Sequence, residues 1–254
     1  MMNYIKSELY RVSHTHGVYS FTGILIFIAV LLNTGIHFWG NQYAITSFSY
    51  SNFVANPIIF VIMGTVTAYL LYEGNRKNGN LKNTVASGIP RTKIFIGECI
   101  VSILTATFIM ILALGAWIIS AELLLERTGP VALKDLLLEV PAVYLIALAG
   151  LISGIFFLER FEKNTVGILA WIFIWFLFPN FLMYLGMRFD AVYKIAMWLP
   201  NNFFGTINGL NVNMSKCITI WDTADGWIKC IVSGTIGVVV FLLAGLVSLR
   251  KRDL

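Results

Sequence analysis

Residue types that carry out catalysis or hold metals are sparse in this chain and rarely stand at a spacing that brings them together. His14 and His16 are two positions apart, so their side chains diverge on a helix, and no cysteine or acidic residue stands beside them. The sequence contains no HExxH motif, no paired aspartates within an apolar run and no GxxxxGK[ST] phosphate-binding loop. We therefore expect no catalytic residues, no metal site and no ATP site in the chain itself.

One polar and basic stretch interrupts two long apolar runs and reads NGNLKNTVASGIPRTKIF, from Asn78 to Phe95. Asn80 is a candidate N-cap for a two-turn helix, Leu81 to Ser87. Gly88 follows as the expected C′ residue and Pro90 as the stop. The pattern predicts a short helix with a defined end.

This predicted helix is amphipathic but too short to be stable alone. One face carries Leu81, Thr84 and Val85, and the rest of the surface carries Lys82, Asn83 and Ala86. Either a partner packs against it, or the stretch is a solvated loop whose basic residues only fix the membrane topology.

The surroundings of this stretch are those of an integral membrane protein. The chain has 254 residues, of which 58% are hydrophobic and 12% charged, whereas a soluble domain has about 25% charged residues. A hydrocarbon core of about 30 Å needs about 20 apolar residues per helix. The uncharged runs predict one all-α domain, residues 1–254, with six transmembrane helices and not a barrel. They cover 18–39, 51–72, 99–121, 140–158, 165–187 and 230–249.

The net charge of +5 reflects membrane orientation and not a nucleic-acid partner, because most of the 18 basic residues fall on the side that holds both termini. That side carries Lys6, Arg11, Arg76, Lys77, Lys82, Arg91, Lys93, Arg160, Lys163, Arg250, Lys251 and Arg252. We expect a multi-pass protein of the bacterial cell membrane with both termini in the cytoplasm.

Residues 1–17 precede the first span and predict a helix that lies in the membrane interface. Met2, Ile5, Leu9 and Val12 recur at helical spacing and form an apolar face that would rest on membrane lipid. The alternative is a disordered tail.

Within the predicted boundaries, the spans contain no acidic or basic residue except Glu73 and Glu98, near cytoplasmic ends. Ion-driven carriers place such residues at depth, so we expect no coupling site of that kind. Asn56-Pro57 and Pro179-Asn180 are candidate helix breaks. Each is either a sodium site of unwound backbone or a proline kink whose carbonyls a neighbouring helix satisfies.

The long loop from Arg188 to Lys229 mixes aromatic and turn residues and is expected to dip partly into the interface. Cys217 and Cys230 fall on the same side, where an oxidising environment permits a disulfide. A bridge and two free thiols both remain open.

Four features together resemble ABC-2-type transporter permeases over the whole chain: the N-terminal YIKSELYR, the six spans, the loop NGNLKNTVASGIPRTKIFIGE and the terminal LRKRDL. The loop is the most specific part. Its matching positions are Gly79, Leu81, Lys82, Asn83, Ser87, Gly88, Arg91, Ile94 and Phe95.

The resemblance implies a permease that forms a homodimer, or a heterodimer with a sister permease, and binds two separate ATPase subunits. Those subunits would hold ATP and Mg²⁺. The helix Asn80 to Ser87, including Thr84 and Val85, would insert into the ATPase and couple its closure to the spans. Spans two and five would line the translocation path, with short re-entrant helices after span five at MWLPNNFF. The path residues would be Asn56, Pro57, Trp175, Pro179 and Asn180.

The apolar interior favours a hydrophobic or amphipathic cargo, and an antimicrobial peptide, exported or removed for self-immunity, is the preferred class. A lipophilic drug or a polysaccharide fits the same architecture. Two other readings remain: a non-transporting peptide sensor or immunity scaffold that uses the loop 188–229, and a self-sufficient secondary carrier. The aromatic residues of span five serve either packing and lipid contact or the path.

Overall fold

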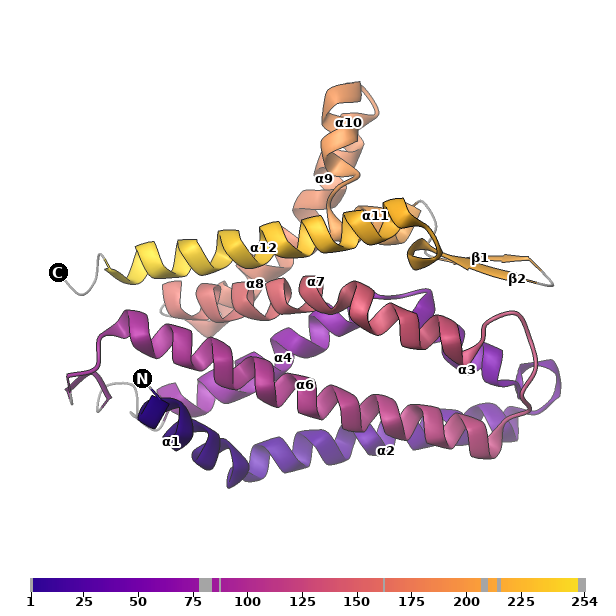
Figure 1. Cartoon of the computed structure of the whole chain (residues 1–254), viewed down its shortest axis with the longest axis horizontal. Helices are drawn as coiled ribbons and strands as arrows, with labels where there is room; N and C mark the ends of the chain where they lie inside the picture. The colour runs from indigo at the N-terminus through magenta and orange to yellow at the C-terminus, as the bar shows by residue number, and fades with distance from the viewer. Residues whose placement is uncertain are drawn as a thin grey trace.

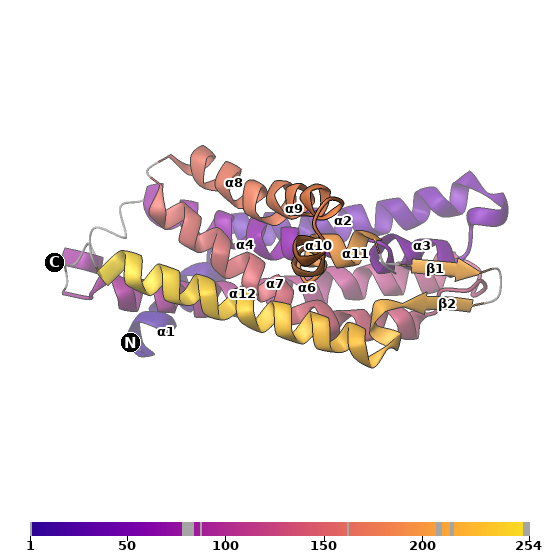
Figure 2. The same cartoon turned by 90° about the horizontal axis from the view of Figure 1, so that it is seen from above.

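The computed structural model describes residues 2–77, 84–86, 88–161, 163–206, 210–213 and 216–250. Long helices run side by side along one axis (Figures 1 and 2). The first helix and the end of the last one lie at one end of this bundle, which we call the N/C end. A small β-hairpin marks the opposite, hairpin end.

Five helices are long and apolar enough to cross a membrane, or up to six if one bent pair counts as a span. They are α2 (His16–Trp39), α6 (Arg91–Leu124), α7 (Leu133–Arg160), the helix Asn164–Gly186 and α12 (Ala224–Arg250). The expected all-α membrane architecture is thus confirmed. The helices extend past the predicted limits, because the apolar runs mark only their least polar parts.

The predicted second span is the bent pair. Its two helices, α3 (Thr46–Val54) and α4 (Ile58–Lys77), meet at 68°. Pro57 lacks an N–H group and cannot continue a helix. The carbonyl groups at the bend accept local bonds: Phe53 O from Asn56 N at 2.7 Å, Asn56 O from Ile59 N at 3.0 Å, and Pro57 O from Phe60 N at 3.2 Å. These three carbonyl groups are therefore satisfied within the bend itself, as at a proline kink.

Helix α7 is the centre of the bundle and packs against α12 and α4 along most of its length (Figure 1). Glycines allow this close approach. A Cβ at Gly234 of α12 would lie 2.8 Å from the backbone carbon of Leu145 and 2.9 Å from the nitrogen of Ile146. A Cβ at Gly154 would lie 2.7 Å from Thr65 Cγ2 of α4.

The N-terminal segment forms helix α1 (Met2–Ser13), so the alternative of a disordered tail is wrong. Of its four apolar residues, Val12 is buried, and Ile5 and Leu9 pack with it against Leu71 of α4 and Val101 of α6. Only Met2 is largely exposed. Three of the four residues of the predicted lipid-facing side thus pack against α4 and α6.

The segment after the fifth long helix contains two short helices, α10 (Asp190–Ala196) and α11 (Pro200–Thr206), as the resemblance implied. Figure 1 shows α9 (Phe178–Gly186) and α10 standing away from the bundle. An antiparallel β-hairpin, β1 (Leu210–Asn213) and β2 (Lys216–Thr219), follows and was not expected. A 3₁₀ turn, η3 (Ile220–Asp222), leads into α12, where Cys230 is a free, buried thiol. Another 3₁₀ turn, η1 (Asn41–Tyr43), joins α2 to α3.

Candidate functional site

The fifth long helix places two of the predicted path residues. It begins as α8 (Asn164–Ile172), widens to π-helical geometry over Phe173–Leu177 and continues as α9. Phe178 donates its N–H to Phe173 O, five residues back. Pro179, next in the chain, has no N–H to donate, and the wide turn accommodates this loss without breaking the helix. The helix therefore continues through Pro179-Asn180 without unwinding, and its irregularity lies in the wide turn just before them.

The wide turn is held against α7 by a hydroxyl group. Ser153 Oγ accepts the indole N–H groups of Trp175 at 2.8 Å and Trp171 at 3.1 Å. It donates its own proton to Gly150 O at 2.7 Å. Trp171 also donates to Gly150 O, at 3.0 Å. Because these groups are buried, water cannot reach them, and these bonds within the protein satisfy them instead.

Trp175 and Pro179 line an apolar cleft of about 490 Å³ between the fifth long helix, the α10–α11 segment and α12. The α10–α11 side contributes Ile195, Trp198, Leu199 and Pro200, and α12 contributes Val232, Ser233, Ile236, Gly237, Val240 and Phe241. Ser233 donates its hydroxyl to Lys229 O at 2.6 Å, within its own helix. The cleft can therefore hold an apolar chain or ring without leaving this hydroxyl unpaired.

Asn202, in the middle of α11, fixes the wall of this cleft. Its side-chain amide donates to Pro179 O at 2.8 Å and to Ala196 O at 3.0 Å, and so ties α11 to both α9 and α10. Asn180 Oδ1 accepts a longer bond of 3.4 Å from Asn201. Sequence reasoning did not identify Asn202 or Ser153, because partners so distant in sequence leave no local pattern.

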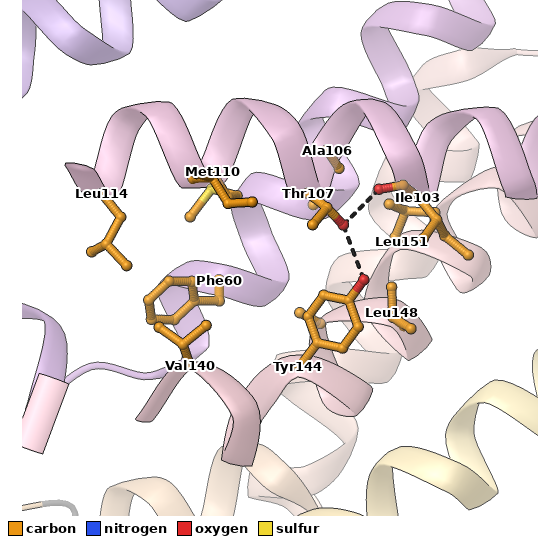
Figure 3. Close-up of a pocket in the computed structure, with 13 residues that line it drawn as sticks. Phe60, Ile103, Ala106, Thr107, Met110, Leu114, Val140, Tyr144, Leu148 and Leu151 are labelled. Carbon is orange, nitrogen blue, oxygen red and sulfur yellow. Dashed lines mark hydrogen bonds between the residues drawn. The ribbon is translucent and has the colours of Figure 1, made fainter. Parts of the chain in front are cut away.

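The other predicted path residues lie elsewhere. Asn56 lines a second cavity of about 380 Å³ between α2, α3, α4 and α6, and Pro57 is buried at the bend. A third cavity of about 100 Å³ lies between α4, α6 and α7, and Figure 3 shows Thr107 and Tyr144 joined across it by a 3.0 Å hydrogen bond. Met110 and Leu114 line both of these cavities. Within one chain, the structure thus brings Trp175 and Pro179 together but separates them from Asn56.

The end of the predicted coupling helix is described, and its geometry confirms the expected stop. Residues 84–86, Thr84 to Ala86, are helical. Gly88 has a φ of 85°, its N–H binds Val85 O at 3.0 Å, and Ile89 N–H binds Thr84 O at 3.4 Å. This pair of bonds is the Schellman motif, which requires a left-handed residue at the position of Gly88. The remaining predicted coupling residues, Gly79, Leu81, Lys82, Asn83 and Ser87, lie outside the described part of the chain.

Helix α1 meets this turn. Tyr4 lines a small cavity of about 110 Å³ with Gly88, Ile89, Pro90 and Lys93. Pro90 precedes Arg91, the first residue of α6. Burial raises the pKa of the Tyr4 phenol above its ordinary value, and the carboxylates of Glu98 and Glu8 raise it further. A neutral Tyr4 thus connects α1 to the turn that leads into α6.

One acidic residue was missed. Glu139 lies one residue before the predicted span 140–158, but α7 begins at Leu133, where Asp135 Oδ2 accepts the N–H of Ala132 at 2.8 Å. Glu139 is consequently a fully buried helical residue. The predicted boundary of this span, residue 140, was set too late, so the helix includes an acid that the predicted spans left out. The predicted span began at residue 140 because a hydropathy run ends at a charged residue such as Glu139.

Among the described residues, no three histidine, cysteine or acidic side chains are grouped as a metal site. No family model, no curated protein and no solved structure matches the chain.

Proposed function

We propose that this chain is the membrane-spanning subunit of an ATP-driven exporter of the ABC-2 type. It would work as a homodimer or with a sister permease, in a bacterial cell membrane, with the N/C end in the cytoplasm. Two separate ATPase subunits would bind ATP and Mg²⁺. The cargo would be hydrophobic or amphipathic, with an antimicrobial peptide as the preferred class.

The observation that carries this proposal is the defined turn at Gly88. A solvated loop needs no Schellman motif, whereas a lever that transmits force needs a rigid end. The turn leads directly through Pro90 into α6, and the Tyr4 side of α1 lies against it. A push on the segment 84–86 would therefore reach α6 and α1 together.

The apolar cleft supports the cargo class. Its lining is aromatic and aliphatic apart from Ser233, whose hydroxyl is already bonded. Such a surface favours a lipid-soluble or amphipathic molecule over a small ion or a sugar chain, because polar groups of the latter would lose their bonds to water without replacement.

The test uses an ATPase whose reading frame adjoins that of this chain, expressed with it and copurified after mild solubilisation. Val85→Asp places a charge on the face expected to enter the ATPase, and Ala86→Asp places the same charge on the exposed side of the same turn. We expect Val85→Asp to lower recovery of the ATPase by about tenfold, equivalent to about 1.4 kcal/mol, and Ala86→Asp to leave it unchanged. Equal recovery with both variants would contradict the coupling role.

A further inference from the structure

Glu139 of α7 carries a carboxyl group that has no partner. The residue is 0% exposed, and neither Oε1 nor Oε2 has a hydrogen bond. One helical turn on either side, Leu136, Ala142 and Val143 are also buried and belong to the main apolar core. The side chain therefore lies on the face of α7 that the rest of the bundle covers.

The dipole at the start of α7 does not stabilise a negative charge on Glu139. The helix dipole acts within the first turn, and Glu139 lies beyond the first turn of a helix that begins at Leu133. The acid that does use the helix start is Asp135, through its bond to Ala132 N.

The charged and titratable groups on the packed elements are engaged elsewhere or stand apart. On α12, Asp225 pairs with Lys229 at 2.9 Å. On η3, Asp222 accepts from Thr219 N at 2.7 Å and from its hydroxyl at 2.8 Å. On α6, Glu122 pairs with Arg127 and accepts from Tyr50 of α3. Among the side chains that the structure describes, the other buried or half-buried titratable groups on these elements are Cys230 on α12, Glu98 and Cys99 on α6, Glu159 on α7, and Tyr69 and Tyr72 on α4, while α8 carries none.

An isolated carboxylate in apolar surroundings is far less stable than the neutral acid, because nothing replaces the water that it loses. A metal ion would need several ligands, and the described residues provide no such group. A proton can bind to a single carboxyl group without further ligands. We propose that Glu139 is a proton-binding site: its carboxyl group holds a proton while the bundle is closed around it and releases the proton when the hairpin end opens.

The segment η3 is the cover that would have to move. Trp221 is buried and donates its indole N–H to Asp135 O at 3.0 Å, the carbonyl one turn before Glu139. Ile220 is also buried, and its carbonyl lies so close to Gly226 that an added Cβ there would collide with it. The position of η3 over the start of α7 thus depends on the absence of a side chain at Gly226.

This site does not depend on the proposed ATPase. A proton exchanged at Glu139 would accompany each opening of the hairpin end, whether ATP or an ion gradient drives that opening. Failure of the coupling experiment above would leave the proton site intact, and the reverse also holds.

The test uses the full chain in lipid nanodiscs. Infrared spectra of the wild type and Glu139→Gln at neutral pH are subtracted, in water and in D₂O. We expect one C=O band of a protonated carboxylic acid that shifts in D₂O and is lost in the variant. Absence of the band would show an ionised Glu139, paired with a cation or a cargo group, and would overturn the proposal.

A second measurement distinguishes an exchanging site from a merely neutral acid. Dicyclohexylcarbodiimide adds to protonated carboxyl groups, and mass spectrometry locates the adduct. We expect labelling at Glu139 in the wild type, several-fold faster labelling in Gly226→Ala, and none in Glu139→Gln. Gly115→Ala, where an added Cβ meets nothing within 4 Å, is the matched control and should label as the wild type does. No labelling of Glu139 in either the wild type or Gly226→Ala would overturn the exchange.

Discussion

Trp175 donates its indole N–H to Ser153 Oγ at 2.8 Å, and this bond sets the position of the wide turn in the fifth long helix. The same indole ring lines the apolar cleft. A hydroxyl group of the central helix α7 thus fixes a wall of the proposed cargo site.

Ser153→Ala should destabilise the protein by about 1–3 kcal/mol, because the indole of Trp175 loses its buried acceptor and that of Trp171 keeps only Gly150 O. Thermal unfolding in detergent, followed by tryptophan fluorescence, measures this. Thr34→Ala is the control, since Thr34 is only half-buried and its hydroxyl bonds to Val30 O within α2. Equal melting of the two variants would refute the role of Ser153.

Gly234→Ala should cost about 1–3 kcal/mol, because its Cβ would meet the rigid backbone of α7 at Leu145 and Ile146. The same thermal assay applies. Gly115→Ala adds the same methyl group to open space and should destabilise the protein by no more than about 0.5 kcal/mol. A Gly234→Ala protein as stable as the wild type would mean that α7 and α12 are not in this close contact.

Ser233→Trp should fill the apolar cleft from the α12 side. We expect it to weaken the binding of an apolar fluorescent dye by roughly tenfold, or about 1.4 kcal/mol. Ile231→Trp, on the same helix but outside the lining, should bind the dye as the wild type does. If both variants bind equally, the dye does not occupy this cleft.

Tyr4 gives a prediction at alkaline pH. Its pKa lies above the ordinary value, so the folded protein holds the phenolic proton at a pH where the unfolded chain has lost it. The stability contributed by the neutral phenol is therefore complete below about pH 10 and is lost as the pH rises further. Tyr4→Phe should show a smaller loss of stability above that pH than the wild type. Identical alkaline melting curves for the two proteins would contradict the burial of Tyr4.

The membrane helices could be predicted because hydrophobic length is a property of consecutive residues. The end of the short helix at Gly88 could be predicted for a similar reason, since glycine and the following Pro90 act locally. Asn56-Pro57 marked the bend between α3 and α4, but its angle depends on what each half packs against. Pro179 gave the same local signal, yet there the helix widened instead of breaking, and sequence alone does not distinguish the two outcomes.

The contacts of the cleft and of Glu139 were not predictable for a different reason. The bond from Trp175 to Ser153 and the bonds from Asn202 to Pro179 join separate helices, and no spacing rule reports such pairs. Glu139 was left outside the predicted span 140–158 because a charged residue ends a hydropathy run, even when the helix continues through it. Hydropathy alone therefore does not reveal a buried polar residue at the edge of an apolar run.

The central claim is that this bundle moves its cargo with work supplied by a partner ATPase. The most direct measurement reconstitutes the purified chain in liposomes, with and without the adjoining ATPase, and follows a dye-labelled cationic amphipathic peptide. The account predicts uphill accumulation only with both the ATPase and ATP, including when a proton gradient is imposed on the chain alone. Uphill accumulation by the chain alone would contradict it.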